Sequence, residues 1–316
     1  VIEIFEEPSF PSGPDFVVDN KRQLMMGFIL GAGAVIIFLA IHSYLKNTVK
    51  NREDITEKLD TTEIATLQHE KKYKNIKSVL ARKKKTLLLT DTATGFGYSE
   101  TIKKIRTSLL YQMRKKNVKV IFVSSTLPGE GKTTIAANLA ESMGHRYKNV
   151  LLIEGDNRKT DLIKLLGMSK EQVSDWSQGF ASGHKFADSI YAVDRHKFKA
   201  MVNVSENSFT AEDLASGKLK RFIDHMRQEM DVIIIDGPPA RKRSEAELWA
   251  RIADASVLVV KQNHAQVKYI NDTIDMLDTY GKGLMGCVFN DAVATEGFLS
   301  SGYGYGYGYG YGYGYG

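Results

Sequence analysis

The residues best suited to chemistry lie in a glycine-containing loop inside residues 118–140. β-branched residues come first, and Pro128, Gly129 and Gly131 then interrupt the pattern before an Ala/Leu-rich segment begins. This order of strand, loop and helix is what a phosphate-binding loop requires, because loop amides and the start of the helix both point at anions. The spacing departs from G-x-x-x-x-G-K-[ST] at one place, where Thr126 stands for the first glycine.

Two side chains of this loop are suited to the phosphates themselves. Lys132 is placed to reach the β- and γ-phosphates of a triphosphate, and Thr133 to put its hydroxyl on magnesium. The glycines let the backbone approach the phosphates because they carry no Cβ. We therefore expect ATP and Mg²⁺ at this loop. The residues predicted to contact ATP here are Pro128, Gly129, Glu130, Gly131, Lys132, Thr133 and Thr134.

Acidic residues follow two further apolar stretches. Residues 149–153 lead into Glu154 and Asp156, and residues 232–235 lead into Asp236. The carboxyl ends of parallel strands are where open α/β sheets bind ligands, so these acids should meet the glycine loop. The second stretch has the Walker B form, in which an apolar strand delivers a carboxylate to magnesium. We predict Lys132, Glu154, Asp156 and Asp236 as catalytic residues, with Thr133 and Asp236 as the magnesium ligands.

The remaining pattern indicates which elements position these groups. Apolar strands at 256–261 and 284–289 alternate with helices at 246–252 and 266–280. Continuous apolar strands separated by amphipathic helices predict a mainly parallel sheet with helices on both faces. We therefore expect an α/β fold of the doubly wound P-loop NTPase type.

Some polar positions have two interpretations each. Asn290 closes the last strand, where its amide would either contact a base ring or stabilise a loop turn. Residues 99–112 have helical spacing, and Glu100, Lys103 and Arg106 stand three apart on one face of that helix. Such a set is either an ordinary salt-bridged surface or a motif with a partner.

A long apolar stretch near the start departs from soluble behaviour. Residues 24–41 contain no charged side chain, and extended to residue 45 they would form a helix of roughly 33 Å, enough to cross a bilayer core. A buried helix of this length would show a polar face, which this stretch lacks. Lysine and arginine are more frequent after the stretch than before it. We predict one transmembrane helix whose C-terminal side is cytoplasmic.

The overall composition fits this organisation. The formal net charge of +6 is modest, and we expect no nucleic-acid partner. The basic run at 82–85 is either a solvated face of the connector or a segment that touches anionic lipid. Cys287 is the only cysteine, which excludes a disulfide framework and favours a reducing compartment. Because the sequence starts with Val1 and not methionine, we expect it to be part of a longer chain or a processed product. The predicted parts are a Pro-rich stub at 1–22, a transmembrane helix at 23–45, a connector at 46–93, a catalytic domain at 94–297 and a tail at 298–316.

The sequence ends in strictly alternating glycine and tyrosine from residue 302. Glycine at every second position disfavours a stable strand, so we expect a mobile segment. The segment is either a low-complexity sticky tail or a set of phenol acceptors tethered near a phosphoryl-transfer site. Full phosphorylation would add roughly −10 to −14 charges and reverse the net charge of the chain. The candidate acceptors are Tyr303, Tyr305, Tyr307, Tyr309, Tyr311, Tyr313 and Tyr315.

Together these motifs resemble the bacterial tyrosine kinases of capsule and exopolysaccharide export, the Wzc-like autokinases, over nearly the whole chain. Residues 128–134 are similar to the family's Walker A, 154–158 to its Walker A′ and 232–239 to its Walker B. Residues 100–106 match its oligomerisation motif, with lysine at the middle position. The stub and apolar stretch look like the end of a polysaccharide co-polymerase module whose periplasmic part would precede Val1.

The resemblance implies a membrane-anchored protein-tyrosine kinase that uses ATP to phosphorylate a neighbouring subunit's tail. It places the protein in the bacterial inner membrane, where it would regulate polysaccharide polymerisation and export. It also implies a homo-oligomeric ring of about eight subunits, contact with lipid and the export machinery, and a tyrosine phosphatase as partner. Arg158 and Asn290 would join the ATP contacts, and Glu100, Lys103 and Arg106 would contact the next subunit.

One departure from the family concerns the base. The family's Walker A′ begins with aspartate, where this chain has Glu154, and the extra methylene changes the reach of the carboxylate. Either Glu154 or Asp156 would accept the phenol proton.

Two other functions fit the same loop and sheet. One is a MinD/ParA-like ATPase in which water attacks, and the other is a structural co-polymerase subunit that uses ATP only as an assembly ligand. Phosphorylation of the tail separates the kinase from both.

Overall fold

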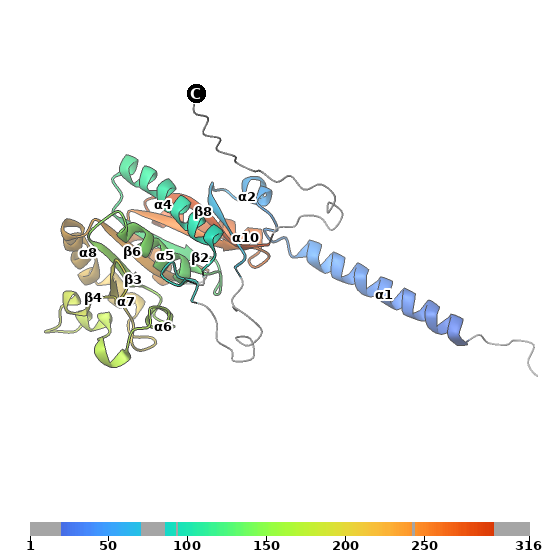
Figure 1. The fold of residues 1–316 in the computed structure, drawn as a ribbon, viewed down its shortest axis with the longest axis horizontal. Helices are drawn as coiled ribbons and strands as arrows, with labels where there is room; N and C mark the ends of the chain where they lie inside the picture. The colour runs from blue at the N-terminus through green and yellow to red at the C-terminus, as the bar shows by residue number, and fades with distance from the viewer. Residues whose placement is uncertain (1–19, 71–85, 93, 242–243, 294–316) are drawn as a thin grey trace, which may run out of the picture. The chain divides into compact units, whose positions relative to one another are not determined.

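The computed structural model describes residues 20–70, 86–92, 94–241 and 244–293 (Figure 1). The chain divides into two compact units, residues 1–47 and 48–316. In the first unit the described element is α1, Asn20–Leu45. Its stretch Asn20–Ile41 is long and apolar enough to cross a membrane, and apolar side chains such as Leu24 and Phe28 are exposed around it. The helix expected from the apolar run is thus present, and it has no polar face.

The second unit is built on an eight-stranded sheet in the order β1-β8-β7-β2-β6-β3-β5-β4. Every pairing is parallel except that between β4 and β5. This confirms the predicted mainly parallel sheet. The strands are β1 Glu63–Gln68, β2 Val120–Ser125, β3 Val150–Glu154, β4 Tyr191–Ala192, β5 Lys199–Met201, β6 Val232–Pro239, β7 Ala255–Lys261 and β8 Leu284–Ala292.

Helices cover both faces of this sheet. On one face lie α4 Phe96–Lys116, α5 Lys132–Gly144 and α6 Asp161–Leu165. On the other lie α2 Glu53–Lys58, α7 Ala211–Ala215, α8 Lys218–Glu229, α9 Ser244–Ile252 and α10 Val267–Tyr280. Short 3₁₀ turns complete the region between α6 and α7: η1 Lys170–Gln172, η2 Trp176–Phe180 and η3 Phe186–Ser189.

The central strands are apolar on both sides because each face has its own core. In β2, Phe122 belongs to the core under α8, α9 and α10, whereas Ile121 and Val123 belong to the core under α4 and α5. All six residues of β2 are buried, and the strand lies between β6 and β7. A doubly covered parallel strand needs apolar residues at successive positions, which is the pattern in the sequence.

Residues 48–68 differ from the expected connector over 46–93. Residues 63–68 form the strand β1, which pairs in parallel with β8 at the edge of the sheet. Val49 and Ile55 are fully buried in the core beneath α10. The compact unit therefore begins at Thr48, because strands and helices from the far end of the sequence supply the burial that a local polar context hides. The Pro-rich stub before residue 20 and the tyrosine tail lie outside the described residues.

This arrangement makes residues before 94 part of the core that stabilises the domain. We expect Leu67→Ala, which empties a fully buried position in β1, to lower the free energy of unfolding by about 2–5 kcal/mol. Thr56→Ala, at an exposed position of α2, is the control and should change it by less than about 0.5 kcal/mol. Urea unfolding measures both, and equal stabilities would show that residues 48–68 are a loose connector.

Candidate active site

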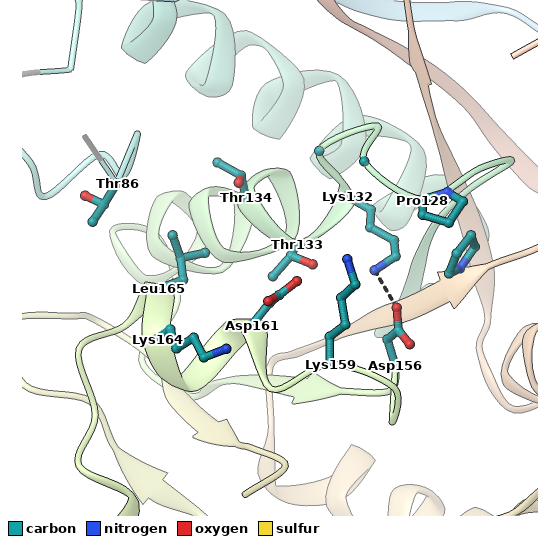
Figure 2. A pocket seen from close by; sticks show the side chains of 13 residues that line it. Thr86, Pro128, Lys132, Thr133, Thr134, Asp156, Lys159, Asp161, Lys164 and Leu165 are labelled. Atoms are coloured by element: carbon teal, nitrogen blue, oxygen red, sulfur yellow. Dashed lines mark hydrogen bonds and ion pairs between the residues drawn. The ribbon is translucent and has the colours of Figure 1, made fainter. Parts of the chain in front are cut away.

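A pocket of about 470 Å³ opens where β2, β3 and β6 end, beside the start of α5 (Figure 2). Among the predicted site residues, seven line it: Pro128, Gly129, Gly131, Lys132, Thr133, Thr134 and Asp156. The others lining it are Thr86, Lys159, Asp161, Lys164, Leu165 and Pro239. The glycine loop and Asp156, which follows β3, therefore meet at one cavity, as expected for the carboxyl ends of parallel strands.

The backbone of the loop is shaped to receive an anion. Gly129 and Gly131 have φ of +83° and +94°, which glycine adopts without a steric penalty. A Cβ at Gly131 would also lie 2.3 Å from the side-chain nitrogen of Asn290. Since Gly131 precedes α5 and has no side chain to cap it, the first amides of the helix are left to a ligand.

The ammonium group of Lys132 lies between two carboxylates. Its Nζ is 2.9 Å from Oδ2 of Asp156, the contact dashed in Figure 2, and 3.9 Å from Oδ1 of Asp236. Burial alone would lower the pKa of Lys132, but the charges of Asp236 and Asp156 outweigh it, so the pKa is raised. Lys132 therefore stays charged in a site with little water, where it attracts phosphate strongly.

Asp236 lies inside the fully buried strand β6 and has an oxygen free for a cation. Its Oδ1 has no hydrogen-bond partner among the described residues. Burial raises the pKa of Asp236 to about 6, although the Lys132 charge and a hydrogen bond from Thr133 lower it. A carboxylate oxygen and a hydroxyl are hard ligands of the kind Mg²⁺ takes alongside substrate phosphates. These two residues thus fit the predicted divalent metal.

Glu130 and Asn290 hold the loop from behind. The Glu130 carboxylate accepts hydrogen bonds from the amides of Leu127 (2.6 Å) and Lys261 (3.3 Å), and burial raises its pKa to about 7. Asn290 donates its side-chain amide to the Glu130 carbonyl at 2.7 Å. Asn290 also lines a neighbouring cavity of about 130 Å³, on which Gly131 borders as well. Its position is thus compatible with both interpretations given above, while the contact it makes here is with the loop.

Glu154 is turned away from the pocket. Its carboxylate accepts hydrogen bonds from the amides of Leu162 (2.9 Å) and Asn203 (2.7 Å), and it does not line the cavity. Burial raises the pKa of Glu154 to about 8 despite these two amides, and the nearby charges of Asp236 and Asp156 raise it further. Of the two acids considered as proton acceptors, Asp156 lines the pocket, whereas the Glu154 carboxyl contacts the amides of Leu162 and Asn203.

Three buried side chains absent from the predicted site fix the backbone that carries these acids. Asn203 donates to the carbonyls of Glu154 (3.3 Å) and Asp156 (3.2 Å). The indole of Trp176 donates to the Glu154 carbonyl at 2.9 Å, and the indole of Trp249 donates to that of Gly155 at 3.1 Å. The one available signal was that the sequence holds only two tryptophans. The sequence does not indicate which backbone carbonyls these two indoles contact.

The cations near Asp156 also differ from expectation. Arg158 is exposed, outside the lining of the pocket, and its backbone amide donates to Asp156 Oδ1 at 3.3 Å. Lys159 and Lys164 line the pocket instead (Figure 2). The basic residues clustered after β3 in the sequence were the signal that could have suggested these two lysines.

The three charged residues of α4 separate into two environments. Lys103 Nζ and Glu100 Oε1 form an exposed ion pair at 2.7 Å. Arg106 is half-buried and donates to the Ser142 carbonyl of α5 at 3.0 Å. Glu100 and Lys103 are therefore accessible to a partner, whereas Arg106 joins α4 to the helix that follows the phosphate loop.

Comparison with known proteins finds a matching family model and several similar tyrosine-protein kinases. A family model described as an AAA domain matches residues 118–280. Tyrosine-protein kinase ptk of Acinetobacter johnsonii is 24% identical over 296 residues, which cover 92% of this chain and 39% of ptk. Tyrosine-protein kinase CpsD of Streptococcus pneumoniae is 31% identical over 182 residues, 57% of this chain and 78% of CpsD.

A solved structure has the same fold. The kinase domain of Escherichia coli tyrosine kinase ETK matches with a TM-score of 0.66 at 22% identity, over 83% of this chain and 100% of that domain. The full-length relatives are longer, since the chain spans 39% of ptk and 40% of AmsA from Erwinia amylovora.

The buried Glu154 carboxyl should make stability depend on pH. Between its unfolded pKa near 4.3 and its folded pKa of about 8, the folded chain holds a proton that the unfolded chain releases, so stability falls as pH rises. From pH 7 to 8 we expect Glu154 to lower the free energy of unfolding by about 1 kcal/mol; Glu130, with a pKa of about 7, also titrates in this range, but it does so equally in a Glu154 variant.

Glu154→Gln cannot ionise and should remove this contribution to the slope, whatever its effect on the absolute stability. Urea unfolding of both proteins at pH 7 and pH 8, followed through the buried Trp176 and Trp249, measures the slope. An identical pH dependence in the two proteins would contradict the assigned pKa.

Proposed function

This chain belongs to the family of bacterial tyrosine-protein kinases, and we propose that it transfers the terminal phosphoryl group of ATP to tyrosine residues of its own C-terminal tail. The observation that supports this most is the position of Lys132, charged and buried between Asp156 and Asp236 at the head of α5. A cation there neutralises the β- and γ-phosphates while the loop amides hold them.

The nucleotide would take the cavity along the glycine loop. The amides at the start of α5 would bind its phosphates, and Lys132 would exchange its ion pair with Asp156 for the phosphate oxygens. Thr133 and Asp236 would hold Mg²⁺, which when bound neutralises charge on the transferring phosphoryl group. Lys159 and Lys164, which also line the pocket, would add positive charge toward the incoming nucleotide.

Asp156 would act as the base for the acceptor tyrosine. A new bond forms between the phenol oxygen and the γ-phosphorus while the bond from that phosphorus to the β,γ-bridging oxygen breaks, leaving ADP. The phenol proton passes to the Asp156 carboxylate, which the departing Lys132 contact has freed. A free phenol titrates near pH 10, so a carboxylate at the acceptor raises the reactive fraction at neutral pH.

The acceptor would come from a neighbouring subunit in the bacterial inner membrane. Anchoring through α1 concentrates subunits in one plane, which favours transfer between chains. The exposed pair Glu100 and Lys103 on α4 would contact the next subunit of the assembly. We place the protein with the machinery that polymerises and exports polysaccharide, where tail phosphorylation would loosen the assembly by adding negative charge.

Transfer between chains can be tested by mixing two variants. Lys132→Met removes the phosphate cation, so alone it should lose tail phosphorylation by at least about a hundred-fold. Mixed with an active subunit that lacks residues 298–316, its tail should become labelled. Phosphotyrosine mapping by mass spectrometry after incubation with ATP and Mg²⁺ measures both results.

Two outcomes would contradict the proposal. Normal labelling of isolated Lys132→Met would remove this lysine from the mechanism. Release of phosphate by the unmodified chain with no labelled tyrosine would indicate an ATPase in which water is the acceptor.

The choice of base gives a second test. Asp156→Asn should slow phosphoryl transfer by about 10²–10⁴-fold, because the asparagine cannot take the phenol proton. Glu154→Gln should slow it by less than about ten-fold, since its carboxyl faces Leu162 and Asn203 and not the pocket. Single-turnover rates at saturating ATP distinguish the two, and a larger loss in the Glu154 variant would reverse the assignment.

A further inference from the structure

A second concave surface lies between η3 and α8, with a volume of about 510 Å³. It shares no lining residue with the nucleotide pocket. Its walls come from the loop before η3, from η3 itself and from the outer side of α8. None of the motifs discussed above includes these residues.

The floor of this groove is apolar and aromatic. Phe186 and Met226 are buried, and Phe222 and Ile190 are half-buried beside them. The rings of Phe186 and Phe222 lie 5.2 Å apart at an angle of 37°. Such a floor suits the face or edge of another aromatic ring.

The rim of the groove is cationic. Lys185 and Arg221 are exposed, and neither side chain makes a hydrogen bond or an ion pair with any other described residue. Lys218 is occupied by the Phe180 carbonyl at 2.8 Å. The acid of this lining, Glu229, lies 3.4 Å from His225.

The start of α8 adds to this positive potential. The helix has no acidic residue in its first turn, and its N-cap, Gly217, offers no side chain to the free amides. Lysine and arginine are normally unfavourable at this end, because the helix dipole is already positive there. An aromatic floor beside two cations that pair with no described residue, one of them (Arg221) in the first turn of α8, matches a ligand that carries both a ring and a multiply charged anion.

We propose that this groove binds phosphotyrosine of the protein's own tail, and so acts as a docking site for the product of the reaction. The proposal rests on the proposed function for the source of the phosphotyrosine. Residues 297–316 contain no charged side chain, so the unmodified tail offers no anionic side chain to the cations of the rim. Each phosphate would add about −1.5 to −2 charges on an aromatic ring.

The tail is long enough to reach the groove. Its tyrosines follow the end of β8 at Ala292 by roughly 11 to 23 residues, which span about 36–75 Å when extended. A domain of this size is about 45–50 Å across. Because tyrosine recurs at every second position, a released phosphotyrosine would be replaced by its neighbour, which prolongs docking.

Peptide binding tests the groove directly. The chain of residues 1–316 in detergent carries Lys132→Met, so that its own tail stays unmodified, and is titrated into a fluorescein-labelled Gly-Tyr repeat peptide bearing phosphotyrosine. Anisotropy should report binding of this peptide and none of the unphosphorylated peptide. A phosphoserine peptide of equal charge, which lacks the ring, should bind at least about ten-fold more weakly.

Charge reversal at the rim supplies the matched comparison. Lys185→Glu with Arg221→Glu should weaken phosphotyrosine binding by about ten-fold or more. Lys220→Glu makes the same kind of change on α8, but Lys220 lies outside the groove in an ion pair with Asp224, so affinity should stay within about two-fold. Should the double variant unfold, Lys185→Gln with Arg221→Gln tests the same contacts.

The proposal is overturned if the unphosphorylated or the phosphoserine peptide binds as tightly as the phosphotyrosine peptide. It is also overturned if Lys220→Glu weakens binding as much as the rim variants do. Because the phosphopeptide is synthetic, the result does not depend on whether this chain phosphorylates its own tail. Phosphotyrosine mapping tests that separately.

Discussion

The structure depends on keeping one ammonium group charged in a buried site. Lys132 sits at the head of α5 with Asp156, which follows β3, on one side and Asp236, which lies in β6, on the other. In a low-dielectric site an unpaired charge is costly, so removing one member leaves the others uncompensated. The sheet satisfies this constraint because the parallel strands β3 and β6 are neighbours, with Glu154 opposite Asp236 in register.

Glu154 and Asp156 are positioned mostly by hydrogen bonds to the backbone carbonyls of residues 154–156. Asn203, Trp176 and Trp249 hold the carbonyls from Glu154 to Asp156, and a Cβ at Gly155 would lie 2.9 Å from the Trp249 ring. Glu154 adds its carboxyl to this framework. The Glu154 side chain, one methylene longer than an aspartate, reaches the backbone amides of Leu162 and Asn203. Asp156 is therefore the acid that faces the pocket.

The segment that follows α1 in sequence is joined to the same end of the sheet as the phosphate loop. Asn263 donates its amide to the Val49 carbonyl at 2.9 Å, and Gln262 donates its side-chain amide to the Lys50 carbonyl at 2.6 Å. The adjacent His264 contacts the Pro128 carbonyl at 2.9 Å. Val49 and Lys50, at the start of the second unit, and Pro128 of the phosphate loop thus contact the same short loop after β7.

The sequence by itself determined the fold class, the glycine loop with Lys132 and Thr133, and the acids Asp156 and Asp236, because each depends on local pattern: apolar runs, glycine spacing and the residue that ends a strand. Tertiary structure decided the rest. Residues 48–68 join the sheet through β8, the Glu154 carboxyl turns toward Leu162 and Asn203, and Lys159 replaces Arg158 at the pocket. Each of these outcomes depends on contacts with residues far away in the sequence. Such contacts set the direction and burial of a side chain, and a local sequence pattern does not specify them.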